Sequence, residues 1–150
     1  MKNYDLTKIL PHKPPMILID DVLEYDLEEK TLTAIVNIND KKILFDNSHN
    51  GINALAGIEF MAQTIGCYAY FKNGEKPPKI GFLLGSKLYN NAIEYFLNGK
   101  SYIIKVHEIF TDNQIVAFDC IIYDNKEEIA SATINVYQSD NIKEFINNNG

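Results

Sequence analysis

Apolar and polar positions alternate along parts of this chain in the way that strands require. In residues 32–38 every second residue is apolar, which is typical of a half-buried strand. The prolines within residues 11–15 stop any helix begun in residues 3–9. The residues after them, 16–25, predict an earlier strand. We expect the two strands to form a hairpin.

A long apolar run follows at residues 52–71, with the length and the Ala, Leu and Met content of a helix. Asn50 or Asn53 can cap its start, and Asn73 with Gly74 ends it. The run is apolar on nearly every face, so it must be buried in a protein or in a membrane. Its Glu, Gln and Thr side chains are costly in lipid, which favours burial under a sheet over the alternative of a transmembrane span.

The pattern returns to strands after the helix. Four more are predicted, at residues 80–89, 101–110, 115–124 and 128–138. Turn residues such as Asn98 and Gly99 separate them, so we expect three successive hairpins. The element order predicts one α+β domain, residues 1–150, in which an antiparallel sheet of about six strands wraps around one long central helix. This is the arrangement of a hot-dog fold.

Composition narrows the classes of partner. The 14 Lys and Arg against 20 Asp and Glu give a net charge of −6, so no broad basic field is expected for nucleic acid or an anionic membrane. The N-terminus has no apolar run of signal-peptide length, which predicts a cytoplasmic protein. Cys67 and Cys120 have no second ligand at metal-site spacing, so we expect two buried free thiols.

Glu59 is the only charged residue between Ala54 and Phe71, and Gln63 lies one helical turn later on the same face. A buried carboxylate is unfavourable unless it protonates or gains partners. A carboxyl group held in this way suits general acid or base chemistry. The alternative is a Glu whose carboxylate reaches the surface or accepts hydrogen bonds from backbone donors.

Two motifs, in order and about 30 residues apart, carry a family resemblance. Residues 10–26 read LPHKPPMILIDDVLEYD and residues 57–66 read GIEFMAQTIG. They resemble the LPHxxPxLLxDxV stretch and the ExMAQxxG helix motif of 3-hydroxyacyl-acyl carrier protein dehydratases. With KIGFLLGSKLY at residues 79–89, the wording is most similar to the branch found in aryl polyene pigment clusters. The resemblance covers about residues 5–138 and implies a homodimer with its active-site tunnel at the dimer interface.

The resemblance implies reversible loss of water from a 3-hydroxyacyl thioester on acyl carrier protein, without a metal or other cofactor. Glu59 would protonate the departing hydroxyl while an imidazole takes a proton from C2. Backbone N–H groups at the helix start, around Ala54 to Ala56 and including Leu55, would stabilise the thioester oxygen. Gln63 would orient the acid or the substrate, or else hydrogen-bond across the dimer. Gly66 would lie along the acyl chain.

The usual base of that family is absent here. Those enzymes carry a His in a GHFPxxPxxPG loop fourteen residues before the motif acid, a position that Phe45 occupies in this chain. His12, from the LPH motif, is the first candidate to replace it, unless it hydrogen-bonds the N-terminal loop to the sheet. His49 in the loop itself is the alternative base, although solvated loop histidines are commoner. We expect His107, on a late strand, to be structural.

Three functions therefore remain open at this point. The first is the dehydratase, the second is a hot-dog acyl thioesterase whose helix carboxylate activates water, and the third is a non-catalytic acyl-binding partner subunit. The LPH and ExMAQ motifs favour the first over the second, and the retained Glu59 favours it over the third. An acidic carrier protein would dock on basic residues, for which the candidates, unless they are simply scattered, are Lys72, Lys76, Lys79 and Lys87.

Overall fold

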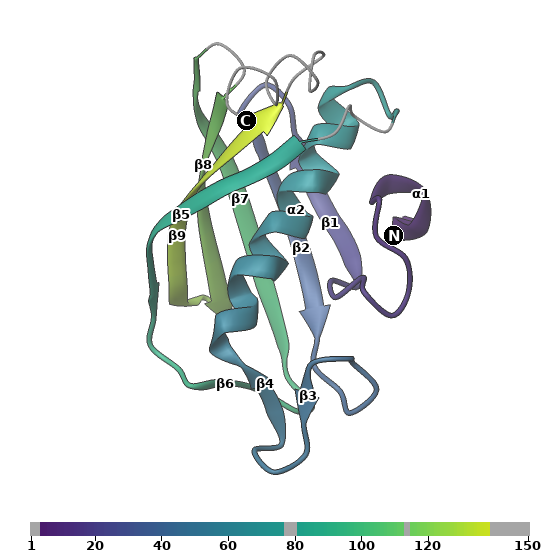
Figure 1. Ribbon diagram of the computed structural model, residues 1–150, viewed down its shortest axis with the longest axis vertical. Coiled ribbons are helices and arrows are strands. Elements are labelled where there is room, and N and C mark those ends of the chain that lie inside the picture. The colour runs from purple at the N-terminus through teal and green to yellow at the C-terminus, as the bar shows by residue number, and fades with distance from the viewer. Residues whose placement is uncertain (1–3, 77–80, 113–114, 139–150) are drawn as a thin grey trace, which may run out of the picture.

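The computed structural model describes residues 4–76, 81–112 and 115–138. A long helix, α2 (Gly57–Lys72), lies against one face of an antiparallel sheet (Figure 1). Within the described residues that sheet has six strands, in the order β1-β2-β7-β8-β9-β5. Their bounds are Asp21–Asp26 (β1), Thr31–Asn37 (β2), Gly81–Asn91 (β5), Ser101–Asp112 (β7), Ile115–Asp124 (β8) and Glu127–Gln138 (β9). The predicted α+β hot-dog architecture is confirmed.

A second, smaller sheet was not predicted. It joins β3 (Phe45–Asp46), β4 (Gly51–Asn53) and β6 (Tyr95–Leu97) below the start of α2 (Figure 1). Strands of two or three residues are too short to show an alternation of apolar and polar positions. A four-residue helix, α1 (Leu6–Ile9), precedes the prolines and is capped by Asp5, whose carboxylate accepts from the Thr7 N–H at 3.0 Å.

The first strand begins later than predicted. β1 starts at Asp21, and residues 16–20 before it are not in a strand. The reason is that the backbone there bonds to the helix: the N–H groups of Leu18 and Ile19 donate to the side chain of Gln63. The hairpin of β1 with β2 is confirmed.

Two of the three later hairpins are confirmed, since β7 pairs with β8 and β8 with β9. The hairpin predicted between residues 80–89 and 101–110 is wrong, because β5 pairs with β9 instead. After β5 the chain leaves the main sheet to form β6, which pairs with β4. The turn at Asn98 and Gly99 therefore joins the two sheets rather than two neighbouring strands.

The helix is shorter at its start than the predicted 52–71. Ile52 and Asn53 belong to β4, and a 3₁₀ turn, η1 (Ala54–Ala56), leads into α2. Asn53 caps that turn, as one alternative predicted, by accepting the Leu55 N–H at 2.9 Å. Asn73 forms the C-cap of α2, which confirms the predicted end.

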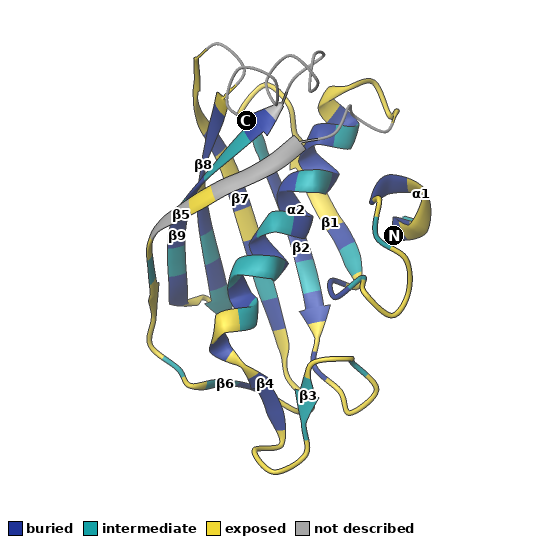
Figure 2. Ribbon diagram, viewed as in Figure 1, coloured by how far each residue is buried: buried dark blue, intermediate teal, exposed yellow. Residues whose placement is uncertain are grey.

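The core lies between α2 and the sheet. Side chains such as Phe60 and Met61 from the helix meet Leu32 and Ile104 from the strands, all of them fully buried. The expectation that the whole helix is buried is wrong for this single chain. One face stays half-exposed (Figure 2) and carries Ala56, Ile58, Glu59, Ala62, Gly66 and Tyr70.

Among the described residues there is no helix long and apolar enough to cross a membrane. Cys67 and Cys120 are buried and free, as predicted.

Candidate active site

Glu59 lies in the first turn of α2, where a carboxylate interacts favourably with the helix dipole. Its side chain is 43% exposed, so the expected burial is wrong for the single chain. Two side chains meet its Oε1 atom: the Gln63 amide donates at 3.0 Å, and His12 Nε2 lies 3.4 Å away. In the described part of the chain Oε2 has no partner, which leaves that oxygen open to a ligand.

Gln63 fixes the position of this carboxylate. Its side chain is 1% exposed, and its Oε1 accepts from the N–H groups of Leu18 at 2.9 Å and Ile19 at 3.4 Å. These two donors determine which way the amide points. Its Nε2 therefore faces the Met16 carbonyl, at 2.8 Å, and Glu59. Both amide hydrogens are used within the chain, so Gln63 holds the acid in place.

His12 reaches Glu59 from the segment between α1 and β1. Its Nδ1 is buried and has no hydrogen-bond partner among the described residues. Nε2 is the nitrogen that faces the carboxylate. The alternative role, a hydrogen bond from His12 to the sheet, is not observed within those residues. The structure thus brings together the two side chains that the sequence motifs single out.

Gly66 makes room for the chain segment that carries His12. A Cβ atom at position 66 would lie 2.9 Å from Leu10 Cδ2. Because such an approach is too close for two carbon atoms, the small residue lets Leu10 pack directly on the helix. Gly66 remains half-exposed on the same helix face as Glu59.

His49 lies in the turn between β3 and β4 and has other partners. Its Nδ1 is 2.8 Å from Asp46 Oδ2, and its ring stacks on Tyr95 with centroids 4.3 Å apart. Hydrogen bonds from Ser48 and His49 lower the pKa of Asp46 to about 2. Within this chain the described contacts of His49 do not include Glu59, so His12 is the imidazole beside the acid.

Two of the backbone donors expected at the helix start, those of Ala54 and Leu55, are already used. The Ala54 N–H donates to the Glu94 carbonyl at 2.9 Å, and the Leu55 N–H donates to Asn53. The expectation of free donors for a thioester oxygen is therefore wrong for Ala54 and Leu55. The Ala54 carbonyl also accepts from the Tyr89 hydroxyl at 2.5 Å.

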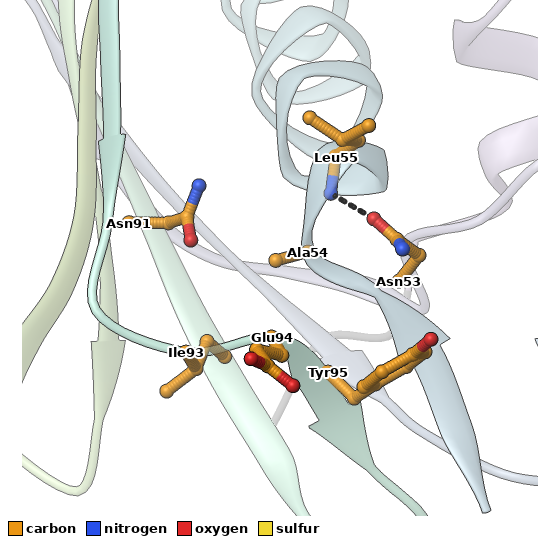
Figure 3. Close-up of a pocket in the computed structure, with 7 residues that line it drawn as sticks. All are labelled: Asn53, Ala54, Leu55, Asn91, Ile93, Glu94 and Tyr95. Atoms are coloured by element: carbon orange, nitrogen blue, oxygen red, sulfur yellow. Dashed lines mark hydrogen bonds between the residues drawn. The ribbon is translucent and has the colours of Figure 1, made fainter. Parts of the chain in front are cut away.

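Ala54 and Leu55 instead line a cavity of about 300 Å³ at the start of the helix, one turn before Glu59 (Figure 3). The lining mixes amide, carboxylate and apolar side chains, and it consists of Asn53, Ala54, Leu55, Asn91, Ile93, Glu94 and Tyr95. Leu55 is 68% exposed beside it. Across the residues that the structure describes, no cluster of His, Cys, Asp or Glu suits a metal ion.

The remaining predicted residues lie elsewhere. Lys72 pairs with the buried Glu108 at 2.5 Å, and Lys76 is exposed. The predictions for Lys79 and the Lys87 side chain lie outside the described residues. His107 is exposed on β7.

The model of the ApeP-like family, described as ApeP dehydratase, matches residues 4–147. A relative from Teredinibacter turnerae, named 3-hydroxyacyl-[acyl-carrier-protein] dehydratase FabZ, is 27% identical over 140 residues, 87% of this chain and 91% of the relative. A protein of the same name from Erwinia tasmaniensis is 32% identical over 81 residues, which cover 52% of this chain and 53% of that protein.

Solved structures share the fold. The dehydratase heterocomplex ApeI:P from Xenorhabdus doucetiae matches with a TM-score of 0.84 at 21% identity, over 99% of this chain and 100% of the other. The protein smu.793 from Streptococcus mutans, bound to acetyl CoA, matches with a TM-score of 0.65 at 13% identity, over 87% and 95% of the two chains.

Proposed function

The chain belongs to the ApeP-like dehydratase family, and on that premise we propose that it removes water reversibly from 3-hydroxyacyl thioesters of acyl carrier protein to give trans-2-enoyl thioesters. The names of the FabZ relatives describe this substrate class. The observation that carries the proposal is the 3.4 Å contact between His12 Nε2 and Glu59 Oε1. One base and one acid side by side are what the elimination of water requires.

In the proposed reaction His12 Nε2 takes a proton from C2 of the thioester. The electron pair of that C–H bond forms the C2–C3 double bond, the C3–O bond breaks, and protonated Glu59 delivers a proton to the departing hydroxyl as water. His12 then carries the extra proton and Glu59 lacks one. Transfer of a proton across the 3.4 Å gap from Nε2 to Oε1 returns both groups to their starting state.

The substrate would lie on the half-exposed face of α2. Glu59 Oε2 is the carboxylate oxygen left for the hydroxyl, because Oε1 is held by Gln63. The acyl chain would follow the small residues Ala62 and Gly66, and Ala54 with Leu55 would line the thioester end through the cavity that they border. In this proposal Gln63 positions the acid, since its hydrogen-bonding groups are used within the chain.

A second subunit would cover this face. Leu55 is 68% exposed and Met16 52% exposed around the site, and apolar side chains of this size favour burial in an interface. We propose a homodimer, as the sequence motifs imply, and the ApeI:P heterocomplex makes a second dehydratase chain the alternative occupant. Light scattering of the purified chain distinguishes the two, because the heteromeric alternative predicts a monomer until the partner is added.

The proposed activity is tested by incubating the protein with 3-hydroxyacyl and trans-2-enoyl thioesters of acyl carrier protein and measuring loss or gain of one water by mass. We expect Glu59→Gln and His12→Ala each to lower the rate about 100-fold or more. His49→Ala serves as the matched histidine control and should keep its activity. Full activity in His12→Ala with loss in His49→Ala would instead identify His49 as the base.

Two other outcomes would overturn the proposal. Thioester cleavage that depends on Glu59 would identify a thioesterase. No conversion above that of Glu59→Gln would indicate a non-catalytic acyl-binding subunit.

A further inference from the structure

Lys42 is a nearly buried cation close to the site. Its side chain is 10% exposed and lies in the loop after β2. Its Nζ donates to the Leu18 carbonyl at 2.8 Å and to the two carboxylate oxygens of Asp20 at 2.9 and 2.8 Å. An ammonium group has three hydrogens, so every donor of Lys42 is used.

The carbonyl that Lys42 contacts belongs to the peptide group between Leu18 and Ile19. In a trans peptide the C=O and N–H point in opposite directions. The C=O of this group accepts from Lys42, and its N–H, on Ile19, faces Gln63 Oε1 at 3.4 Å. The peptide group is therefore held between the ammonium of Lys42 and the amide of Gln63.

The far side of this arrangement rests on the sheet. Asp20 Oδ2 accepts from the Asn37 N–H at 2.6 Å, and the Asp20 N–H donates to the Ile35 carbonyl at 2.8 Å. Both partners belong to β2. A continuous set of hydrogen bonds thus runs from β2 through Lys42 and the peptide to Gln63, and from Gln63 to Glu59.

Resting on the proposed dehydratase function, we propose that Lys42 is a positioning residue for Glu59, acting through the Leu18–Ile19 peptide group and Gln63. A cation on the carbonyl polarises the peptide and strengthens its N–H as a donor. Gln63 is then fixed with its Nε2 toward Glu59 Oε1. Catalytic groups require this kind of support to stay within about 0.5 Å of the productive geometry.

The test uses Lys42→Met, which keeps an unbranched side chain of similar length and removes the charge. Lys42→Arg is the conservative variant, because a guanidinium can still donate to the carbonyl and the carboxylate. Lys100→Met is the matched control: Lys100 pairs with Asp124 at 2.5 Å in the turn before β7, and its described contacts do not include the site. Circular dichroism and thermal melting verify that each variant is folded.

The first readout is independent of activity. In ¹⁵N-labelled protein the side-chain amide resonances of Gln63 report its bonds to Glu59 and Met16. We expect them to shift and to exchange faster with solvent in Lys42→Met, to recover in Lys42→Arg and to stay unchanged in Lys100→Met. If Lys42→Met does not fold, Asp20→Asn weakens the same arrangement and should give a smaller shift of the same resonances.

The second readout is kinetic. Lys42→Met should lower kcat about 10-fold with KM unchanged, because Lys42 holds the acid and does not touch the substrate. Unchanged Gln63 resonances in Lys42→Met would overturn the inference whatever the activity. If the Gln63 resonances shift in Lys42→Met but the wild-type protein dehydrates no substrate, the proposed function is overturned and the positioning of Glu59 by Lys42 remains supported.

Discussion

Glu108 is a carboxylate buried where β7 meets the end of α2. Its side chain accepts from Tyr68 at 3.1 Å, from Lys72 at 2.5 Å and from Thr111 at 3.0 Å. Burial alone would raise the pKa of Glu108, but the hydrogen bonds from Lys72 and Thr111 outweigh it and hold this pKa below the ordinary value. The charged form of Glu108 therefore stabilises the fold.

Replacing Glu108 tests this contribution. A group whose pKa is lowered in the folded state stabilises above its ordinary pKa, and the gain disappears as pH falls through the folded pKa. We expect Glu108→Gln to lower the free energy of unfolding by about 1–3 kcal/mol at pH 7, and the difference from wild type to shrink in acid. Urea denaturation at pH 7 and below pH 4 measures both, with Asp124→Asn at an exposed pair as the control. A difference that is constant with pH would contradict this account.

At the site, sequence reasoning predicted a candidate acid, a candidate base and Gln63 as a residue that orients the acid, but not the contacts that hold Gln63 itself. Glu59 and His12 are recognised because each stands within a motif of known spacing. Gln63 bonds to Met16, which is 47 residues away, and no local pattern reports a contact of that kind. The same holds for Lys42. Its neighbours in the sequence do not distinguish it from an exposed loop lysine, because the burial of its ammonium depends on the approach of Leu18 and Asp20.

At the scale of elements, the start of α2 depends on its contact with β5. The Tyr89 hydroxyl donates to the Ala54 carbonyl, and burial raises the pKa of Tyr89 to about 12. A Cβ atom at Gly57 would lie 2.2 Å from this hydroxyl oxygen and 3.1 Å from Ile122 Cδ1. Gly57 is therefore required for close packing of the helix start on β5 and β8.

Two substitutions together test this packing. Gly57→Ala should lower the free energy of unfolding by about 1–3 kcal/mol, and Tyr89→Phe alone by about 0.5–1.5 kcal/mol. Because the phenylalanine removes the atom that the new methyl group meets, the double variant should lose less than the sum of the single losses. Urea denaturation of the four proteins measures the coupling. Strictly additive losses would show that the hydroxyl is not what excludes a side chain at Gly57.

The elements were predictable to different extents for physical reasons. Strands such as β2 and β8 are long enough to display their alternation, and the composition of α2 predicts a helix, most of which is buried. The partner of β5 was not predictable, because strand pairing depends on where the intervening chain goes. Residues 95–97 leave the main sheet to pair with β4, and three residues carry too little pattern to indicate this.

At the scale of the whole molecule, one core joins the helix to the sheet. Buried residues from α1, α2 and the strands of both sheets belong to a single hydrophobic cluster. Cys67 lies on the helix side of this core and Cys120 on β8, and burial raises the pKa of each thiol to about 12. Thiols held in this way are unreactive, since the thiolate is the nucleophile.

The two thiols therefore report whether the proposed single domain unfolds as one unit. We expect both to resist a thiol reagent in the native protein and to react at the same urea midpoint, coincident with loss of circular dichroism, because helix and sheet share the core. Mass spectrometry of peptides from protein labelled at each urea concentration assigns the reaction to Cys67 or Cys120. Labelling of Cys67 at lower urea than Cys120 would show that α2 detaches while the sheet persists, and the description of one cooperative domain would then fail.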